Sequence, residues 1–515
     1  MHTNGLKDRS RLDKKELIFL ILAATVTITF VSTSSPLYPF NPWDDVNVFF
    51  TMGRAIKHGM IPYKDIFDHK GPVLYFVFFL AAIVSEKSFV GIWILECILA
   101  SVYAVFSWKI AKLFTSPSAL SLVLVPLFLG ILYTSRMFNF GGNTEELCFP
   151  LLTVALYLGL RSVVESNGLP ANTDALICGL ISGVLFWIKY TFLGFIIGFC
   201  IYIVCLAIKQ KCFARLWSLI WRFIVGVLVI SIPVLSYFAI TGTLEYLWES
   251  YFYVNIFLYN DADVVLFANV PPILEKIFIM VFCLGETMIR FKGFGTMLLM
   301  TFVSLGFVDK KYRKKTVFLF AVTFVFATAF IFTRNRYVFY YGYLLSYCFG
   351  IMLIPFIRGL NTAEAVFKDH PAIIRALTSI TLLVFYAVSI ILCKNMYLIF
   401  QSKTAVAQYR IADTINQTPD AKMLTYDIMD VGFYTAAGLL PCNRYCASKQ
   451  FGDSYPQLQE EQDKLIAEGY FDYIVTSYFV EEDWDNYELI QEEAVPYIDF
   501  TGDKILDGFK LYKKI

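Results

Sequence analysis

Residues 17–50 read LIFLILAATVTITFVSTSSPLYPFNPWDDVNVFF: a long apolar run, a proline-rich lead-in and two adjacent aspartates, Asp44 and Asp45. The apolar run follows a basic start and is long enough to cross most of a bilayer core about 30 Å thick. It lacks a small-residue cleavage site, so we expect a retained membrane anchor. Because the prolines force an extended path after it, the stretch predicts a span that delivers two carboxylates to the far side of the membrane.

The composition extends this prediction to most of the chain. Of 515 residues, 57% are hydrophobic and 17% are charged, against about 45–50% and about 25% in soluble domains. Residues 395–515 carry 20 acidic and 10 basic residues, and the preceding residues carry 22 and 33. The composition excludes a disordered chain, a coiled coil and a disulfide scaffold. The membrane body has no polar face on which basic and aromatic residues alternate, so nucleic acid is not expected as a partner. We expect a basic membrane body, residues 1–395, and a soluble α/β domain, residues 402–515.

Eleven apolar runs predict crossings of the membrane. Two further runs, Val73–Val84 and Ile273–Ile289, are too short or too charged, and we expect them to lie along the outer interface. The expected fold is an α-helical polytopic membrane protein with about 11 transmembrane helices, interfacial helices and a small C-terminal α/β domain. The crossings are expected at Leu17–Ser34, Phe89–Trp108, Ser118–Thr134, Leu147–Arg161, Ala175–Ile188, Phe192–Ile208, Phe223–Ile240, Gly293–Val308, Thr316–Phe332, Val338–Ile357 and Ile373–Cys393.

Basic residues set the expected orientation. Clusters of Lys and Arg precede the first span, follow Ile208 and precede Thr316, and such clusters stay in the cytoplasm. Eleven crossings then place the N-terminus in the cytoplasm and the C-terminal domain outside, as expected of a multi-pass protein of the cell membrane. The longer loops all fall on the outer face, where ATP and nucleotide sugars are not normally available.

The first outer loop begins with WDDVNVFFTMGRAIKHG, residues 43–59. At helical spacing its apolar residues share one face, and Asn47, Arg54 and His58 lie on the other, which predicts an interfacial helix. One of the two aspartates could serve only as a helix cap. Two adjacent carboxylates are more than capping needs.

The loop continues with MIPYKDIFDHKGPVLYF, residues 60–76, which gathers Asp65, Asp68, His69 and Lys70 before an apolar helix. One interpretation is a solvated loop with charge pairs. The other is a set of ionisable groups held against the membrane surface, near a lipid-borne substrate.

The two stretches together resemble the first loop of the GT-C glycosyltransferases. The shared features are an aspartate at a helix start with an aromatic four residues on, Asp45 and Phe49, then G-x-x-P-Y and K-G-P. The similarity is to polyprenyl-phosphate-sugar-dependent transferases, namely lipid A aminoarabinose transferases, protein O-mannosyltransferases and a related bacterial subgroup. It implies Asp45 as the catalytic aspartate and Asp44 as the second choice. Val46 departs from the subgroup, which often has Ser there.

The resemblance also implies roles for charged residues further along the chain. A second acidic residue near the sugar corresponds to Glu145, with Glu146 as the alternative, although acids are ordinary in the first turn of a helix. Lys189 is a lone cation between two apolar runs. The resemblance places it by the lipid phosphate, and the alternative is a snorkelling lysine at the membrane surface.

Three further residues are candidates for substrate binding. Arg336 and Tyr340 stand at the mouth of a span, either in an interfacial aromatic belt or, as the resemblance implies, against the lipid phosphate and prenyl chain. Glu96 falls inside a span, where a carboxylate costs about 2.5–3.5 kcal/mol and therefore faces a cavity or a partner. Both a functional and a structural role stay open for it.

The acidic tail reads as a small α/β domain. Its pattern predicts helices at 404–416 and 456–468 and strands at 422–426, 473–477 and 509–512. We find no phosphate-binding loop and no nucleophile–base pattern in it. Cys442 and Cys446 could form a disulfide or remain free thiols.

Together these features predict an inverting glycosyltransferase that moves a sugar from a polyprenyl-phosphate donor to a hydroxyl of a glycan, lipid or protein. Asp45 would act as the general base, and Lys189, Arg336 and Lys70 would stabilise the leaving phosphate. No cofactor is expected, and a divalent metal stays open. The alternatives are a secondary transporter and a non-catalytic protein of envelope assembly. Convergence of Asp45, Glu145, Lys189 and Arg336 in one cavity would favour the transferase.

Overall fold

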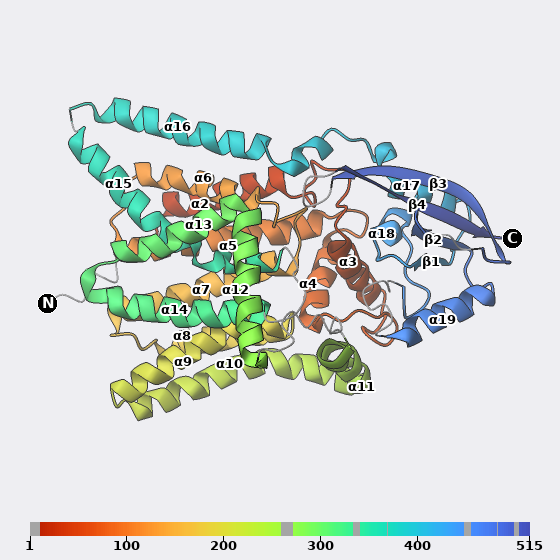
Figure 1. The fold of residues 1–515 in the computed structure, drawn as a ribbon, viewed down its shortest axis with the longest axis horizontal. Helices are drawn as coiled ribbons and strands as arrows, with labels where there is room; N and C mark the ends of the chain where they lie inside the picture. The colour runs from red at the N-terminus through yellow and green to blue at the C-terminus, as the bar shows by residue number, and fades with distance from the viewer. Residues whose placement is uncertain are drawn as a thin grey trace.

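The structure, a computed structural model, describes residues 11–258, 271–332, 340–367, 369–446, 455–480, 483–498 and 504–515. Most of the long helices run along the longest axis of the molecule, and a domain with a β-sheet lies at one end of them (Figure 1). The helical body contains α2 (Lys14–Val31), α3 (Asp44–Lys57), α4 (Pro72–Val84), α5 (Val90–Phe114), η1 (Leu120–Val123), α6 (Leu124–Tyr133), α7 (Thr144–Glu165), α8 (Asn172–Phe186), η2 (Tyr190–Leu193), α9 (Gly194–Lys209), α10 (Phe213–Ile240), α11 (Leu244–Leu247), η3 (Trp248–Leu258), α12 (Pro272–Arg290), α13 (Lys292–Ser304), η4 (Leu305–Phe307), α14 (Lys310–Phe332), η5 (Tyr341–Met352), α15 (Leu353–Val366) and α16 (Pro371–Ile391).

The protein is a polytopic helical membrane protein. In the part of the chain that the structure describes, seven helices are long and apolar enough to cross a membrane, and they include α5, α7, α10, α14 and α16. Shorter apolar helices occupy the expected crossings at α6, α8 and α13. The first expected crossing is the 18-residue α2, whose first turn contains Lys14, Lys15 and Glu16.

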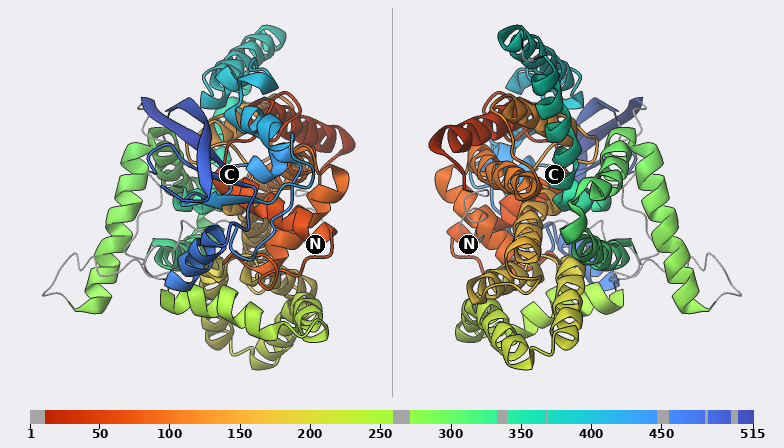
Figure 2. Two further views of the ribbon diagram at one scale, coloured as in Figure 1. Left: turned by 90° about the vertical axis from the view of Figure 1, so that its right-hand side faces the viewer. Right: turned by 90° about the vertical axis from the view of Figure 1, so that its left-hand side faces the viewer.

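The two runs predicted to lie at the interface form α4 and α12. α4 has 13 residues, as many as α13, so its length does not distinguish it from the shorter crossings. α12 has 19 residues, but it runs across the direction of the long helices in Figure 1 and stands at the flank of the bundle in Figure 2. This direction agrees with a helix that lies along the membrane surface.

Hydrogen bonds gather the segments predicted to be cytoplasmic at one end of the bundle. Lys112, near the end of α5, contacts Glu16 at the start of α2 at 2.9 Å. Lys315 of α14 donates to the carbonyl of Asn167, which follows α7. The basic starts and linkers therefore lie together.

The ends of α2 and α16 meet at the opposite end of the bundle. The side-chain amide of Asn395, just after α16, donates to the carbonyls of Val31 and Asn139, both at 2.8 Å. The amide of Thr33 donates to the carbonyl of Phe140 at 3.0 Å. Since α2 starts at one end and α16 finishes at the other, the two termini of the helical body lie on opposite faces. Which of these faces is external remains a prediction from the basic residues.

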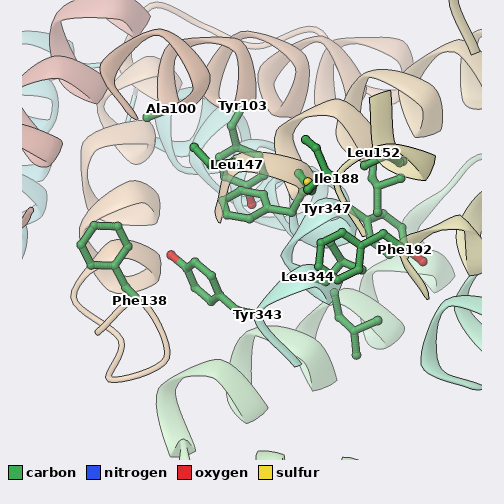
Figure 3. Packing of buried hydrophobic residues seen from close by; sticks show 14 of the residues in the cluster. Ala100, Tyr103, Phe138, Leu147, Leu152, Ile188, Phe192, Tyr343, Leu344 and Tyr347 are labelled. Carbon is green, nitrogen blue, oxygen red and sulfur yellow. The ribbon is translucent and has the colours of Figure 1, made fainter. Parts of the chain in front are cut away.

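The core beneath this second end is aromatic. Tyr343, Leu344 and Tyr347 of η5 lie among residues of α5 and α7, and Phe138 faces Tyr343 (Figure 3). The ring of Tyr343 packs edge-on against Phe149, with centroids 5.2 Å apart. Such pairs contribute about 0.5–1.5 kcal/mol beyond burial, and they fix η5 directly below the loops that carry the charged residues.

The C-terminal domain is the expected small α/β unit. Its sheet has the order β1-β2-β4-β3, with β1 parallel to β2 and the other pairs antiparallel. In the described part of the domain the prediction omits one strand, β3, whose sequence YELIQEEAVPYI is polar and contains a proline. It lies at the sheet edge, where both features are tolerated. The elements are η6 (Lys394–Leu398), η7 (Lys403–Ala405), α17 (Ala407–Ile415), β1 (Met423–Tyr426), α18 (Phe433–Ala437), α19 (Pro456–Ala467), β2 (Tyr473–Ser477), β3 (Tyr487–Ile498) and β4 (Lys504–Lys514).

The prediction that Asn47, Arg54 and His58 form a polar outer face of α3 is wrong for Asn47 and Arg54, whereas His58 is exposed. Asn47 and Arg54 are both buried, because the C-terminal domain covers this side of the helix. Arg54 donates to the carbonyl of Tyr434 at 2.9 Å, and Thr51 donates to Asp430 at 2.5 Å. Cys442 and Cys446 are free thiols.

Candidate functional site

The two aspartates at the start of α3 have different surroundings. The Oδ1 atom of Asp44 accepts the amide of Asp45 at 2.9 Å, so Asp44 partly satisfies the free amides of the first turn. The carboxylate of Asp45 instead accepts a hydrogen bond of 3.1 Å from the hydroxyl of Tyr340. Neither aspartate caps α3, because Trp43 holds the N-cap position and no side chain there accepts a capping hydrogen bond, and Asp45 is directed toward η5.

The K-G-P segment approaches the backbone between α8 and η2. Gly71 and Val73 donate backbone hydrogen bonds of 3.0 Å to Ile188 and Trp187. A Cβ atom on Gly71 would collide with the carbonyl of Trp187, so only glycine permits this approach. The pairing brings Lys70, which precedes Gly71, next to the Lys189 segment.

Lys70 is held by its own loop. Its ammonium group lies 2.6 Å from Nε2 of His69, and the Nδ1 atom of His69 lies 3.2 Å from the carboxylate of Asp68. Burial lowers the pKa of His69 to about 4, so the ring is neutral at pH 7 and can accept from Lys70. Burial alone would raise the pKa of Asp68, but His69 and Lys70 hold it below its usual value.

Lys189 and Glu145 form an ion pair. The Nζ atom of Lys189 lies 2.9 Å from Oε1 of Glu145, and Thr144 donates to the other oxygen at 2.8 Å. Glu145 is fully buried. The ammonium also lies 3.8 Å from the centre of the Tyr341 ring, a cation–π contact. Lys189 is thus a half-buried partner of the buried Glu145, which argues against a lysine that only snorkels.

Charges from three segments, namely α3, the loop with Asp68 and Lys70, and the start of α7, interact at Asp45. Burial raises the pKa of the Asp45 carboxyl, Lys70 opposes this, and Glu145 and Asp68 add to it. Burial and the neighbouring Asp45 raise the pKa of Asp44. Two carboxyls with raised pKa values beside lysines are typical of a site that exchanges protons and binds an anion.

A small cavity lies between the two lysines. Lys70, Lys189 and His69 line it together with Tyr341 and Asn255. Its volume is about 20 Å³, room for about one water molecule, so a phosphate would have to widen it.

Glu96 and Glu146 form a second cluster and do not join the Asp45 group in any described contact. The two carboxyls interact electrostatically, and the Oε1 atom of each is buried without a hydrogen-bond partner among the described residues. Ser32 donates to Glu96 at 2.7 Å, and the amide of Gly142 donates to Glu146 at 2.7 Å. Of the two adjacent acids, Glu145 is therefore the better supported candidate for the second acidic residue of the site. Glu96 satisfies the expectation of a buried partner without lining the lysine cavity.

Some site residues were missed by sequence reasoning, and one cannot be placed. Tyr341 and Asn255 line the lysine cavity, and neither was a candidate, because aromatic residues and amides near membranes are too common to stand out. Arg336 lies outside the described residues. No group of three or more His, Cys, Asp or Glu side chains in the described ranges is arranged to hold a metal ion.

This arrangement of membrane helices and C-terminal domain is shared with solved structures of the kind that the sequence resemblance predicted. Two crystal structures of ArnT from Cupriavidus metallidurans, a lipid A aminoarabinose transferase, share it. The form bound to undecaprenyl phosphate matches with a TM-score of 0.58 over 97% of this chain and 98% of that chain, and the apo form with 0.58 over 96% and 97%. The identity is 10% in both cases, so the likeness concerns the fold. No protein-family description and no curated protein sequence matches the chain.

Proposed function

We propose that the protein is a membrane glycosyltransferase that transfers a sugar from a polyprenyl-phosphate donor to an acceptor hydroxyl at the outer face of the cell membrane. The shared fold alone does not assign an activity. The observation that carries the proposal is that Asp45, Lys70, Glu145 and Lys189, from four separate segments, interact at one buried site.

The position of these groups favours a transferase over a transporter. A transporter needs polar sites near the middle of the membrane. Here the carboxylates and lysines that meet belong to the loops and helix starts nearest the C-terminal domain. A non-catalytic assembly protein has no evident need for two half-buried lysines beside buried carboxylates, since taking charges out of water is costly even when they are paired.

In the proposed reaction Asp45 acts as the general base. It takes the proton of the acceptor hydroxyl while that oxygen forms a bond to the anomeric carbon of the sugar. The bond from this carbon to the phosphate oxygen breaks on the opposite face, so the configuration inverts. Tyr340 orients the Asp45 carboxylate through its hydrogen bond.

Lys70 and Lys189 stabilise the leaving group. The departing polyprenyl phosphate carries the negative charge that the broken bond leaves on oxygen, and two ammonium groups on the same cavity are placed to balance it. Glu145 serves two needs: it holds Lys189 in place before the donor binds, and its negative charge favours the oxocarbenium-like sugar ring. Arg336 stays a prediction as a further phosphate ligand.

An apolar groove offers a path for the prenyl chain. It has a volume of about 460 Å³ and lies between α8, α9 and α10. Phe186 and Leu193, which line the groove, flank Lys189 in the sequence. A chain in this groove would therefore present its phosphate to Lys189.

The proposal is tested by following polyprenyl phosphate release. Purified protein in detergent is incubated with a panel of polyprenyl-phosphate sugars together with glycan, lipid and protein acceptors, and released polyprenyl phosphate is measured by mass spectrometry. We expect consumption of at least one donor by the wild type. A panel covering the common hexose, pentose and amino-sugar donors from which nothing is released would contradict the proposal.

A further inference from the structure

A second cavity lies on the other side of the two aspartates, where the helical body meets the C-terminal domain. It has a volume of about 420 Å³, within the range of small-molecule sites. Its walls come from the lead-in to α3, the turn at Phe140, η6 and its continuation, and residues before and within α17. We name it the junction cleft.

The junction cleft adjoins the reaction site through α3. Asp44 lines the cleft, and Lys70 acts on the neighbouring Asp45 from the lysine cavity. Trp43 also lines the cleft and packs edge-on against Tyr340, with centroids 5.5 Å apart. Asp44 therefore lies on the junction cleft, and the neighbouring Asp45 interacts with Lys70, which lines the lysine cavity.

The lining of the junction cleft combines aromatic faces with hydrogen-bonding groups. Trp43, Phe140, Tyr397 and Phe509 supply rings from four different segments. The negative face of an aromatic ring attracts C–H edges that carry partial positive charge, as the ring hydrogens of a sugar do. Rings at several walls of one cleft suit flat, hydroxylated rings.

Besides the polar atoms of Trp43 and Tyr397, the cleft has two side-chain amides and one carboxylate. Gln401, Gln408 and Asp44 present oxygens and N–H groups that pair with hydroxyls as donors and acceptors. None of the described residues that line the cleft is basic. A phosphorylated acceptor would find no basic side chain among these described lining residues and would meet Asp44, whereas an uncharged sugar meets no repulsion from them.

From these observations we propose that the junction cleft binds the acceptor and that this acceptor is an uncharged glycan. The inference rests on the proposed transferase function and specifies its acceptor. It also gives the C-terminal domain a role, because Gln408 and Phe509 of that domain form part of the wall. The glycan hydroxyl to be modified lies beside Asp44 and is deprotonated by Asp45.

The test uses an array of bacterial surface glycans, probed with the full-length protein in detergent. We expect saturable binding to neutral glycans on the array. The combined substitutions Tyr397→Ala and Gln401→Ala should weaken this binding at least tenfold. The matched control is Phe400→Ala, which removes an aromatic ring of the same segment that is 89% exposed and does not line the cleft. It should bind glycans as the wild type does.

A second arm separates this inference from the donor assignment. Binding of undecaprenyl phosphate is measured for the same proteins and for Lys189→Met. We expect the double variant to bind undecaprenyl phosphate normally, which also reports correct folding, and Lys189→Met to lose it while keeping glycan binding. Three results overturn the junction cleft proposal alone, provided that undecaprenyl phosphate binding is normal. They are that no neutral glycan binds, that the double variant binds glycans as the wild type does, or that only phosphorylated glycans bind. Glycan binding without undecaprenyl phosphate binding overturns the donor assignment instead.

Discussion

The hydroxyl of Tyr340 donates a hydrogen bond to the carboxylate of Asp45 across 295 residues of sequence. Burial raises the pKa of Asp45, and this bond lowers it. The tyrosine therefore keeps the proposed base ionised at a lower pH than burial alone would allow.

Tyr340→Phe should shift the pH profile. Because Asp45 must be ionised to accept a proton, kcat/KM should rise with pH through the raised pKa of this group, above the ordinary aspartate value of about 3.9. Without the hydroxyl the inflection should move to higher pH, so activity falls more at pH 6 than at pH 8. The control is Tyr343→Phe, whose hydroxyl donates to the carbonyl of Leu132 and should leave the inflection in place. An unshifted profile in Tyr340→Phe would refute this role.

Lys189→Met should reduce turnover by about 10²–10³-fold, the usual cost of losing one preorganised donor to a developing anion. Lys109→Met is the matched control. The Nζ atom of Lys109 also lies over aromatic rings, 5.0 Å from the centre of Phe106 and 5.4 Å from that of Tyr157. Lys109 is near the C-terminal end of α5, however, at the end of the bundle away from the candidate site. Equal losses in the two variants, measured by polyprenyl phosphate release, would indicate a packing effect instead of phosphate stabilisation.

Gly432→Ala should disrupt the packing of the C-terminal domain against α3. Gly432 has a φ of 101°, and a Cβ there would collide with the ring of Phe40 and lie 2.7 Å from Oδ1 of Asn47. Gly438 also has a positive φ, 72°, but a Cβ there meets nothing within 4 Å. Gly438→Ala therefore measures the backbone strain alone, of order 1–3 kcal/mol. We expect a larger loss of thermal stability and of turnover in Gly432→Ala, and similar losses would contradict the docking argument.

Cysteine labelling tests the orientation. In a background with the exposed Cys205 replaced by Ser, Ser402→Cys should react with a membrane-impermeant maleimide in intact cells, because residue 402 follows α16 on the proposed outer face. Lys310→Cys, at the basic start of α14, should react only after the membrane is permeabilised. Both positions are exposed. The reverse pattern would place the site in the cytoplasm and remove the basis for the proposed donor.

Much of the fold follows from hydropathy, since each of the 11 expected crossings coincides with a helix and the excess of basic residues marks segments that lie together. The strand β3 could not be predicted, because an edge strand can be polar and carry Pro496. The buried polar side of α3 was also beyond prediction. It is explained by tertiary contacts with Asp430 and Tyr434. No local sequence pattern predicts contacts with a domain some 380 residues further along the chain.

The sequence predicts which charged residues belong to the candidate site, but it does not predict which of their side chains contact one another. Isolated charges near apolar runs, such as Lys189, are conspicuous because burial of a charge is costly. The choice between Glu145 and Glu146 depends on which way each side chain of a helix start points. The structure pairs Glu145 with Lys189 and places Glu146 beside Glu96. Adjacent residues on a helix point about 100° apart, and the loop before the helix decides which of the two faces Lys189.

The most direct test compares Asp45→Asn with the wild type in two assays on the same purified protein, donor turnover and undecaprenyl phosphate binding. The account predicts a fall in turnover of about 10²–10⁴-fold, the usual contribution of a general base, with binding unchanged because the lysines remain. Near wild-type turnover in Asp45→Asn would contradict it.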